Sequence, residues 1–406
     1  MTDLLKELTK IFESQENLIK FLKEKELFKK FVLEILRYAY ENLMNIELDE
    51  ELGYEKWDRT KEKTNYRNGI RTRDLLTEYG KIKDLRVPRA RKGFYPAILD
   101  KYKRSILDID DIVINMYSTG SSTESISKHI ENIYGEKFSK TSISNIIKKV
   151  DEDVKAFKNR KIESKYYVIF MDGIKINIRR GNSVTKETFH ILLGVNEEGK
   201  REVLGFYLNP EESSSFYNEV FEDLKQRGLN KVLLFVTDGL KGIEEVISNH
   251  FPKAKIQRCI VHVNKNLLQK TRKRDRASLI EDFKRVYKSS NKEEALKNYE
   301  LFKLKWGKMY PSIVKNLNNI LEYLLTFYEF PESIRNQIYT TNWIERLNRE
   351  IRKVIHSKSS FPTVDSSERM MYLILKDYMN KWENRTLRGF KQAKYELDSM
   401  MKKIYG

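Results

Sequence analysis

Three carboxylates in this sequence have surroundings that suit phosphoryl-transfer chemistry. Asp172 and Asp238 each follow a run of apolar residues typical of a buried strand, and Glu345 lies in a stretch with helical periodicity. Carboxylate oxygens are the ligands that Mg²⁺ and Mn²⁺ prefer. Two such ions, about 4 Å apart, activate an attacking oxygen and stabilise a leaving oxygen at one phosphate. The three residues therefore predict a site for two Mg²⁺ or Mn²⁺ ions that acts on a phosphodiester.

The surroundings of the two aspartates are more informative than their spacing, because a chain with 59 acidic residues offers many possible sets of three carboxylates. The run Val232–Val236 predicts a buried parallel strand, and Thr-Asp-Gly then leads into a predicted helix over Leu240–His250. A carboxylate just beyond the C-terminal edge of a strand lies where open α/β sheets place their chemistry. For Glu345, the alternative is an ordinary helical salt bridge to Arg349, four residues later.

The elements that position these residues predict an α/β core. Strands are expected over Tyr166–Phe170, Thr188–Val195 and Glu202–Leu208, a helix over Ser213–Arg227, and a final strand over Ala254–Ile260. Three antiparallel strands followed by helix-linked strands form the ribonuclease H-like arrangement. The predicted fold class is therefore α/β, with a mixed five-stranded sheet in a ribonuclease H-like core.

Most of the remaining chain has the patterns of helices, with Pro311 and Pro331 as breaks in a polar helical segment that adds no strand. The N-terminal part is expected to be mainly helical and to bind DNA. The expected regions, in chain order, are a helical region 1–60, a basic strand and loop region 61–107, a helix-turn-helix-like region 108–160, the first part of the core 161–262, an all-helical insertion 263–338, and the completion of the core with a helical tail 339–406.

The overall charge predicts a polyanionic partner. The formal net charge is +18 and the pI is about 9.4, which favours nucleic acid first and an anionic membrane second. No apolar run approaches the roughly 18 residues that a membrane span needs, and the N-terminus lacks the apolar core of a signal peptide. The single Cys excludes an intrachain disulfide and favours a reducing compartment. We expect a cytoplasmic, nucleoid-associated protein.

Two N-terminal segments are candidate DNA contacts. Lys81–Arg104 carries nine basic and two acidic residues with aromatic residues among them, a composition that suits a strand or loop on a phosphate backbone, although a solvated loop is the alternative. Two predicted helices, Ser122–Ile133 and Ser139–Val150, resemble a helix-turn-helix, although plain packing explains them as well. The candidate contacts are Arg86, Arg89 and Arg91 in the first segment and Lys140, Ser142, Asn145 and Lys148 in the second helix.

Further candidates surround the three carboxylates. The stretch from Lys253 to Arg274 holds eight basic and no acidic residues, which suggests contacts with phosphate. Cys259 and His262 alone provide too few ligands for a structural zinc ion. Trp343 suits either core packing or stacking on an unpaired base. The candidate DNA contacts in this part of the chain are Lys241, Arg258, His262, Arg349 and Arg352.

Long motifs in this chain resemble the Mutator-type transposases of bacterial insertion sequences. They include the strand-end Asp172, TDGLKG at 237–242, FPKAKIQRCIVH at 251–262 and TTNWIERLNREIRK at 340–353. YRNGIRTRD at 66–74 and LRVPRARKGFYP at 85–96 are similar to the N-terminal region of the family. The resemblance covers nearly the whole chain. It implies a ribonuclease H-like fold with an all-helical insertion, and a DDE triad at Asp172, Asp238 and Glu345.

The function that follows is DNA transposition. We expect metal-dependent cleavage at the terminal inverted repeats of an insertion sequence, followed by strand transfer into target DNA. The expected partner is double-stranded DNA, bound by a homodimer or a higher oligomer, and no membrane. Two alternatives stay open: a sequence-specific DNA-binding regulator without enzymatic activity, and a nuclease of the same fold that does not join strands.

Overall fold

The computed structural model describes most of the chain and divides it into two units. The first comprises residues 1–117 and 121–148, and the second residues 118–120 and 149–406. The described residues are 23–58, 64–99, 109–134, 137–209, 214–239, 242–340, 342–356 and 358–406, with a few positions before residue 23. The predicted helical pattern before residue 14, Lys241, and the side chain of Trp343 lie outside them.

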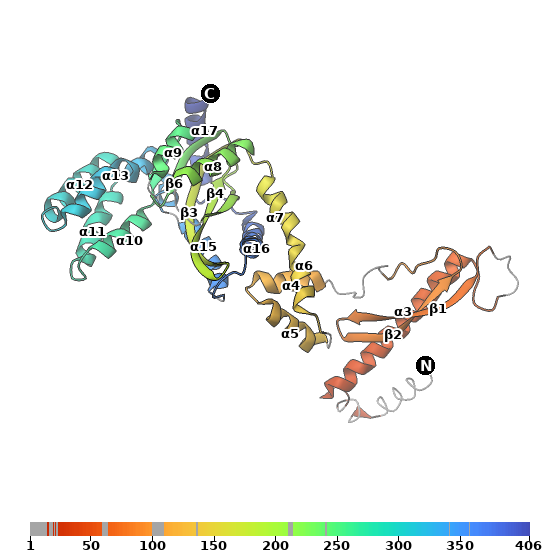
Figure 1. Cartoon of the computed structure of the whole chain (residues 1–406). Helices are drawn as coiled ribbons and strands as arrows, with labels where there is room; N and C mark the ends of the chain where they lie inside the picture. The colour runs from red at the N-terminus through yellow and green to blue at the C-terminus, as the bar shows by residue number, and fades with distance from the viewer. Residues whose placement is uncertain are drawn as a thin grey trace. The chain divides into compact units, whose positions relative to one another are not determined.

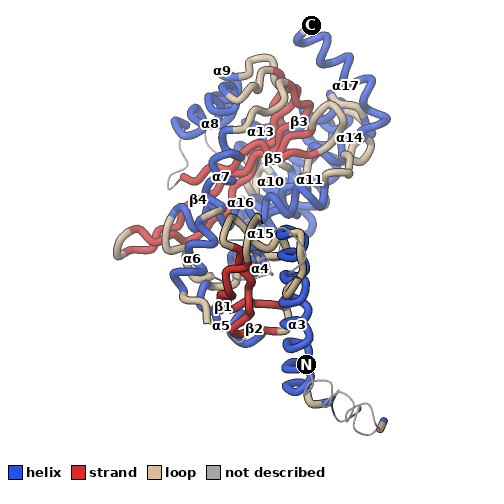
Figure 2. The backbone as a smooth tube through the Cα atoms, turned by 90° about the vertical axis from the view of Figure 1, so that its right-hand side faces the viewer, coloured by secondary structure: helices blue, strands red, loops and turns tan. Residues whose placement is uncertain are grey.

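A long helix and a β-hairpin form the start of the first unit. Helix α3 (Lys25–Leu52) lies alongside β1 (Arg67–Thr77) and β2 (Gly80–Ala90), which pair antiparallel (Figures 1 and 2). Apolar residues of the helix, the hairpin and the segment after it share one small core. The hairpin lies in the segment expected as a basic strand and loop region, and helix α3 lies within the expected helical region 1–60.

Three short helices complete the first unit: α4 (Ile109–Ser118), α5 (Thr123–Tyr134) and α6 (Lys140–Lys148). Helices α5 and α6 match the two helices predicted for a helix-turn-helix, although α6 ends two residues earlier than expected. Ile143 and Ile147 of α6 are buried, which is the apolar spacing that predicted the helix. The next helix, α7 (Val150–Asn159), belongs to the second unit.

The second unit is built on a five-stranded mixed sheet in the order β5-β4-β3-β6-β7. The strands are β3 (Lys165–Arg180), β4 (Ser183–Val195), β5 (Arg201–Asn209), β6 (Lys231–Thr237) and β7 (Lys255–Arg258). Strands β3, β4 and β5 pair antiparallel, whereas β6 pairs parallel to both β3 and β7. The mixed five-stranded sheet agrees with the prediction, as does the order of its strands and linking helices along the chain.

Two predicted strand boundaries were wrong. The strand expected to end at Phe170 continues to Arg180, because β3 and β4 form a long hairpin closed by the pair Arg180 and Ser183. Asp172 therefore lies inside β3, but the parallel pairing of β3 with β6 ends two residues earlier, at Phe170. The strand expected to reach Ile260 ends at Arg258, because a new helix begins at Ile260.

Helices cover both faces of the sheet. One face packs against α8 (Ser214–Gln226) and α9 (Ile243–His250), whose apolar residues join Ile169, Met171 and Phe235 in the main core. Because side chains of a strand alternate between faces, Phe170 and Asp172 point to the opposite face. Helix α15 (Asn342–Ile355) packs on that face and contacts β3.

The segment predicted as a helical insertion is a run of helices without a strand among the described residues. It comprises α10 (Ile260–Lys270), α11 (Arg276–Tyr287), α12 (Lys292–Trp306), α13 (Pro311–Leu325), a 3-10 turn (Thr326–Glu329) and α14 (Glu332–Ile338). Figure 1 shows α10 to α13 gathered at one side of the sheet. The chain ends with α16 (Val364–Trp382) and α17 (Phe390–Tyr405).

Candidate active site

The two aspartates lie at the same level of adjacent parallel strands. Every paired residue of β3 faces the residue of β6 that is 66 positions later, from Lys165 and Lys231 to Phe170 and Val236. Asp238 follows Asp172 by the same 66 positions, just beyond the last pair of the ladder. Neighbouring strands are about 4.8 Å apart and residues in register point to the same face. The fold therefore directs Asp172 to the side of the sheet on which α15 packs and places Asp238 directly after the end of the adjacent strand.

Helix α15 brings the third carboxylate to this side. Its inner face holds Ile344, Leu347 and Ile351, all completely buried, at the spacing of a helix face. Glu345 lies at the edge of that face, and its charge is close enough to raise the pKa of Asp172. Within the described residues, Glu345 and Arg349 form no ion pair, so the salt bridge considered as an alternative is not present.

Asp172 is a buried carboxylate with specific partners. It accepts hydrogen bonds from the backbone amide of Gly173 at 2.9 Å and from Asn348 Nδ2 at 2.7 Å. Its pKa is raised to about 6, chiefly by burial and also by the charge of Glu345, although the amide of Gly173, the charge of Arg352 and the hydrogen bond from Asn348 each lower it. The largest cause is desolvation, because removal from water disfavours the charged form of a carboxylate.

Asn348 was missed in the sequence. It is 1% exposed and lies three residues after Glu345, among the apolar residues of the inner face of α15. Its Nδ2 donates to Asp172, while its Oδ1 is buried and accepts no hydrogen bond. A polar residue inside an apolar helical stripe is the sequence signal that could have identified it, since buried polar groups require partners.

His262 is placed at the same carboxylate by the first turn of α10. Its Nε2 lies 4.0 Å from Asp172 Oδ1, and its Nδ1 is buried without a hydrogen-bond partner. Cys259 is completely buried and immediately precedes this helix, where its backbone amide donates to Thr237 at the end of β6. The Cys-x-x-His element therefore joins the end of β6 to the imidazole beside Asp172.

Arg258 lines a groove of about 280 Å³ next to Asp238, between α10 and α13. Its guanidinium donates to the carbonyl oxygen of Gly239 at 3.1 Å and pairs with Glu244 at 2.6 Å. Both side chains of the ion pair are largely buried. Arg258 thus ties the segment after β6 to α9, and a phosphate contact by this residue stays a prediction.

The remaining predicted contacts are solvent-exposed. On α15, Arg349 and Arg352 are exposed, and the charge of Arg352 reaches Asp172. In the first unit the structure leaves seven predicted residues exposed on β2, the turn after it and α6, namely Arg86, Arg89, Arg91, Lys140, Ser142, Asn145 and Lys148. Lys140 pairs with Glu124 at 2.9 Å. Arg91 lies over the ring of Tyr66 at 5.3 Å, as expected for basic residues interleaved with aromatic ones.

Among the residues that the structure describes, no three carboxylate, imidazole or thiol side chains lie close enough together to hold a metal ion.

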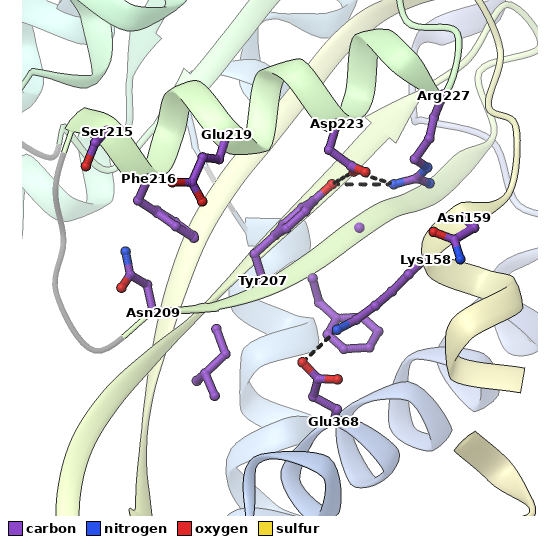
Figure 3. Close-up of a pocket in the computed structure, with 13 residues that line it drawn as sticks. Lys158, Asn159, Tyr207, Asn209, Ser215, Phe216, Glu219, Asp223, Arg227 and Glu368 are labelled. Atoms are coloured by element: carbon purple, nitrogen blue, oxygen red, sulfur yellow. Dashed lines mark hydrogen bonds and ion pairs between the residues drawn. The ribbon is translucent and has the colours of Figure 1, made fainter. Parts of the chain in front are cut away.

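A polar pocket of about 600 Å³ lies elsewhere, beside β5 and α8 (Figure 3). Its charged groups pair with one another, as in Lys158 with Glu368 and Arg227 with Asp223. None of the three candidate carboxylates lines that pocket.

Comparison with known proteins places the chain in a family. The sequence profile of the family described as "Transposase, Mutator family" matches residues 5–385. The transposase for insertion sequence element IS905 of Lactococcus lactis is 39% identical over 94% of this chain and 98% of its own length. The transposase for insertion sequence element IS1201 of Lactobacillus helveticus is 35% identical over 82% of this chain and 90% of its own length.

A more distant relative gives the same result. The transposase for insertion sequence element IS256 in transposon Tn4001 of Staphylococcus aureus is 29% identical over 86% of this chain and 90% of its own length. None of the described helices combines the length and apolar character that a membrane span requires. With a profile match over nearly its whole length, this chain belongs to the Mutator family of transposases.

Proposed function

We propose that this transposase cleaves and joins DNA with two Mg²⁺ or Mn²⁺ ions held by Asp172, Asp238 and Glu345. The observation that carries the proposal is the placement of Asp172 on β3 and of Asp238 just after the adjacent parallel strand β6, with Asp172 hydrogen-bonded to the helix that bears Glu345. The sheet supports a ribonuclease H-like core, since three antiparallel strands are followed by two parallel strands linked through helices. The helical insertion separates Asp238 from Glu345 in the chain.

The residues at this site suit a hard cation. All three proposed ligands offer carboxylate oxygens, which Mg²⁺ and Mn²⁺ prefer. The pKa of Asp172 is raised to about 6 by burial and by the charge of Glu345, so nearby positive charge would stabilise the ionised carboxylate. The buried Oδ1 of Asn348, which accepts no hydrogen bond, adds a further oxygen near this site. The side chains have to move closer together to share an ion.

The protein residues prepare the site for a phosphodiester. Gly173 and Asn348 fix the carboxylate of Asp172 by one hydrogen bond to each oxygen. Arg352, whose charge reaches Asp172, provides positive charge for the DNA backbone. When bound, the ions would activate the attacking oxygen and stabilise the leaving oxygen. In cleavage, water attacks phosphorus and frees a 3′-hydroxyl; in transfer, that hydroxyl attacks a target phosphate and displaces another 3′-oxygen.

The substrate we propose is a pair of terminal inverted repeats together with target DNA. Strand transfer conserves the number of phosphodiester bonds, so it requires no nucleotide cofactor. An insertion element has two ends, and each chain contributes one carboxylate set. We therefore propose that at least two copies of the chain assemble on DNA. Mass measurement of the purified complex with a repeat duplex, giving a single chain per two ends, would exclude this assembly.

The test replaces each carboxylate by its amide. Asp172→Asn, Asp238→Asn and Glu345→Gln should each abolish cleavage of a terminal-repeat duplex in Mg²⁺, because the amides cannot supply the charge that holds two divalent ions. DNA binding should survive, since it depends on many Lys and Arg contacts. Glu396→Gln is the matched control, because Glu396 is exposed on α17. Normal cleavage by any of the three variants removes that residue from the site.

The same assay separates the alternatives. Full activity in a chelator would exclude the metal mechanism. A protein that binds DNA but never cuts it, in Mg²⁺ or Mn²⁺, would be a regulator. A protein that cuts the repeat but does not join the freed 3′-end to a second duplex would be a nuclease.

A further inference from the structure

Three arginines surround one tryptophan at the end of α16. The guanidinium carbons of Arg201, Arg346 and Arg385 lie 4.5, 5.2 and 4.6 Å from the ring centroid of Trp382. Arg201 begins β5, Arg346 lies in α15, and Arg385 follows α16. The second unit therefore gathers three positive charges from distant parts of the chain around a single aromatic ring.

Two of these positive charges, those of Arg346 and Arg385, are not neutralised by a carboxylate among the described residues. Within the described residues, neither Arg346 nor Arg385 makes an ion pair. Arg201 is 7% exposed, and burial lowers its pKa, which Tyr378 raises in part and which the charges of Arg385 and Arg346 lower further. A cation over an aromatic face gains only a weak attraction, so the ring relieves only part of the repulsion among three guanidinium groups. An anion between them would relieve more.

A cavity of about 520 Å³ adjoins the cluster and is lined by Arg346, Arg385 and Trp382. Two acidic residues also line it, but each already pairs with a lysine of its own helix. Glu350 pairs with Lys353 at 2.9 Å, and Asp377 pairs with Lys381 at 2.6 Å. The charge that remains available to a ligand in this cavity is therefore that of the arginines.

The cavity lies on a different flank of α15 from the carboxylate site. Successive residues of a helix are rotated by about 100°, so Glu345 and Arg352 lie on one flank, whereas the cavity-lining Arg346, Glu350 and Val354 run from the outer face to the other flank. The inner face between these flanks is buried against β3. Helix α15 thus presents a proposed catalytic carboxylate on one side and the arginine-lined cavity on the other.

We propose that this cavity, which we name the Trp382 pocket, binds a backbone phosphate of DNA that is distinct from the phosphate being cleaved. The inference rests on the proposed action of the protein on DNA. Guanidinium groups bind phosphate oxygens through paired hydrogen bonds, and the indole holds them in place. Because Arg346 directly follows Glu345, a strand held in the pocket is positioned relative to the carboxylate site by one rigid helix.

The test measures binding of the full chain to a labelled duplex of random sequence, in EDTA, between about 50 and 200 mM KCl. Arg346→Gln/Arg385→Gln should weaken binding and reduce the slope of log K against log salt by about 0.9 for each phosphate that the protein no longer neutralises. Arg388→Gln is the matched control, because Arg388 is exposed three residues after Arg385 and does not line the pocket. It should keep the wild-type slope.

A second variant keeps the test valid if the glutamine variant does not fold. Arg346→Lys/Arg385→Lys retains both charges, so it should keep the slope but bind more weakly, because lysine cannot form the paired hydrogen bonds. Wild-type affinity and slope in both double variants would overturn the proposal. Calorimetry with inorganic phosphate provides the last arm. One outcome would overturn the DNA assignment: the glutamine variant loses phosphate binding, but its DNA binding equals that of Arg388→Gln. The pocket would then be assigned to a free phosphate compound.

The readout is independent of cleavage, because EDTA removes divalent ions. Normal cleavage by the carboxylate variants would contradict the metal mechanism and leave the binding result unaffected. Conversely, unchanged DNA binding by the arginine variants would contradict the Trp382 pocket and leave the proposal for the carboxylate site unaffected.

Discussion

Asn348 donates a hydrogen bond of 2.7 Å to Asp172 Oδ2, joining residues that are 176 positions apart in the chain. The bond connects the middle of β3 to the helix that carries Glu345, so one amide couples the positions of two proposed metal ligands. The other oxygen of Asp172 is held by the amide of Gly173. The orientation of this carboxylate is therefore set before any substrate arrives, as preorganised sites require.

Asn348→Ala tests this positioning role. The hydrogen bond from Asn348 lowers the pKa of Asp172, so its loss should raise that pKa further and move the acid limb of the cleavage pH profile to higher pH. Loss of the donor should also cost about 1–3 kcal/mol of unfolding free energy. Asn348→Ser retains a hydroxyl donor and should restore part of both. A lower stability with an unmoved acid limb would show that Asn348 serves packing alone.

The buried charge of Asp172 should lower the free energy of unfolding of the protein. Its pKa in the folded protein, about 6, exceeds the ordinary value of 3.8, so the folded state favours the protonated form. The ionised carboxylate therefore opposes folding above about pH 6, and this cost disappears as the pH falls through 6 towards 4.

Asp172→Asn should accordingly stabilise the metal-free protein at pH 7.5, by at most about 3 kcal/mol for a shift of about two pKa units. The gain should shrink below pH 6 and vanish below about pH 4. Denaturant unfolding in EDTA at several pH values measures it, with Glu396→Gln as the exposed control. A variant that is no more stable than the wild type at pH 7.5 would show that the carboxylate is well solvated.

Local patterns predicted the parts of the site that lie in one segment. The apolar run before Asp238 predicted β6, and the succession of apolar runs and helical patterns predicted three antiparallel strands followed by two strands linked through helices. The continuation of β3 was missed even though Ile174, Ile176 and Ile178 are buried and alternate with polar residues, the pattern of a strand with one covered face.

Contacts between distant segments were beyond prediction from a single sequence. The helical period shows that Asn348 shares a face with Glu345, but only the packing of α15 on β3 reveals Asp172 as its partner. Likewise, Arg201 and Arg346 are neighbours only because β5 and α15 both approach α16. The pairing of Arg258 with Glu244 depends on how α9 returns beside β7, which residue types alone do not determine.

Arg258 should contribute more to stability than to DNA affinity. Its ion pair with Glu244 is largely buried, and removal of one partner leaves an uncompensated charge that costs about 3–5 kcal/mol. Arg258→Gln and Glu244→Gln should therefore lower the unfolding free energy by similar amounts, while the salt dependence of DNA binding stays unchanged. A lower salt slope for folded Arg258→Gln would assign this side chain to a phosphate instead.

Gly239 provides a second test of the same arrangement. Its backbone has φ +85°, and a Cβ at this position would collide with the guanidinium of Arg258. Gly239→Ala should therefore strain the turn after β6 and displace the guanidinium from Glu244. We expect a loss of stability together with reduced cleavage, because Asp238 precedes this turn. Cleavage and stability equal to those of the wild type would show that the turn accommodates a side chain.

Helix α6 should determine which DNA sequence the protein prefers. Asn145 and Lys148 are both exposed, whereas Ile143 and Ile147 of the same helix are buried, so the helix presents a polar face to solvent. In a helix-turn-helix the second helix enters the major groove, where an Asn amide recognises a base edge and a lysine contacts phosphate.

Asn145→Ala should relax the sequence preference selected from a random duplex library, at a cost of about 1–3 kcal/mol for the preferred sequence. Lys148→Gln should weaken all sequences alike and reduce the salt slope by about 1. Lys30→Gln, on the exposed surface of α3, is the control for loss of one charge. An unchanged preference in Asn145→Ala, together with an unchanged slope in Lys148→Gln, would exclude α6 as the recognition helix.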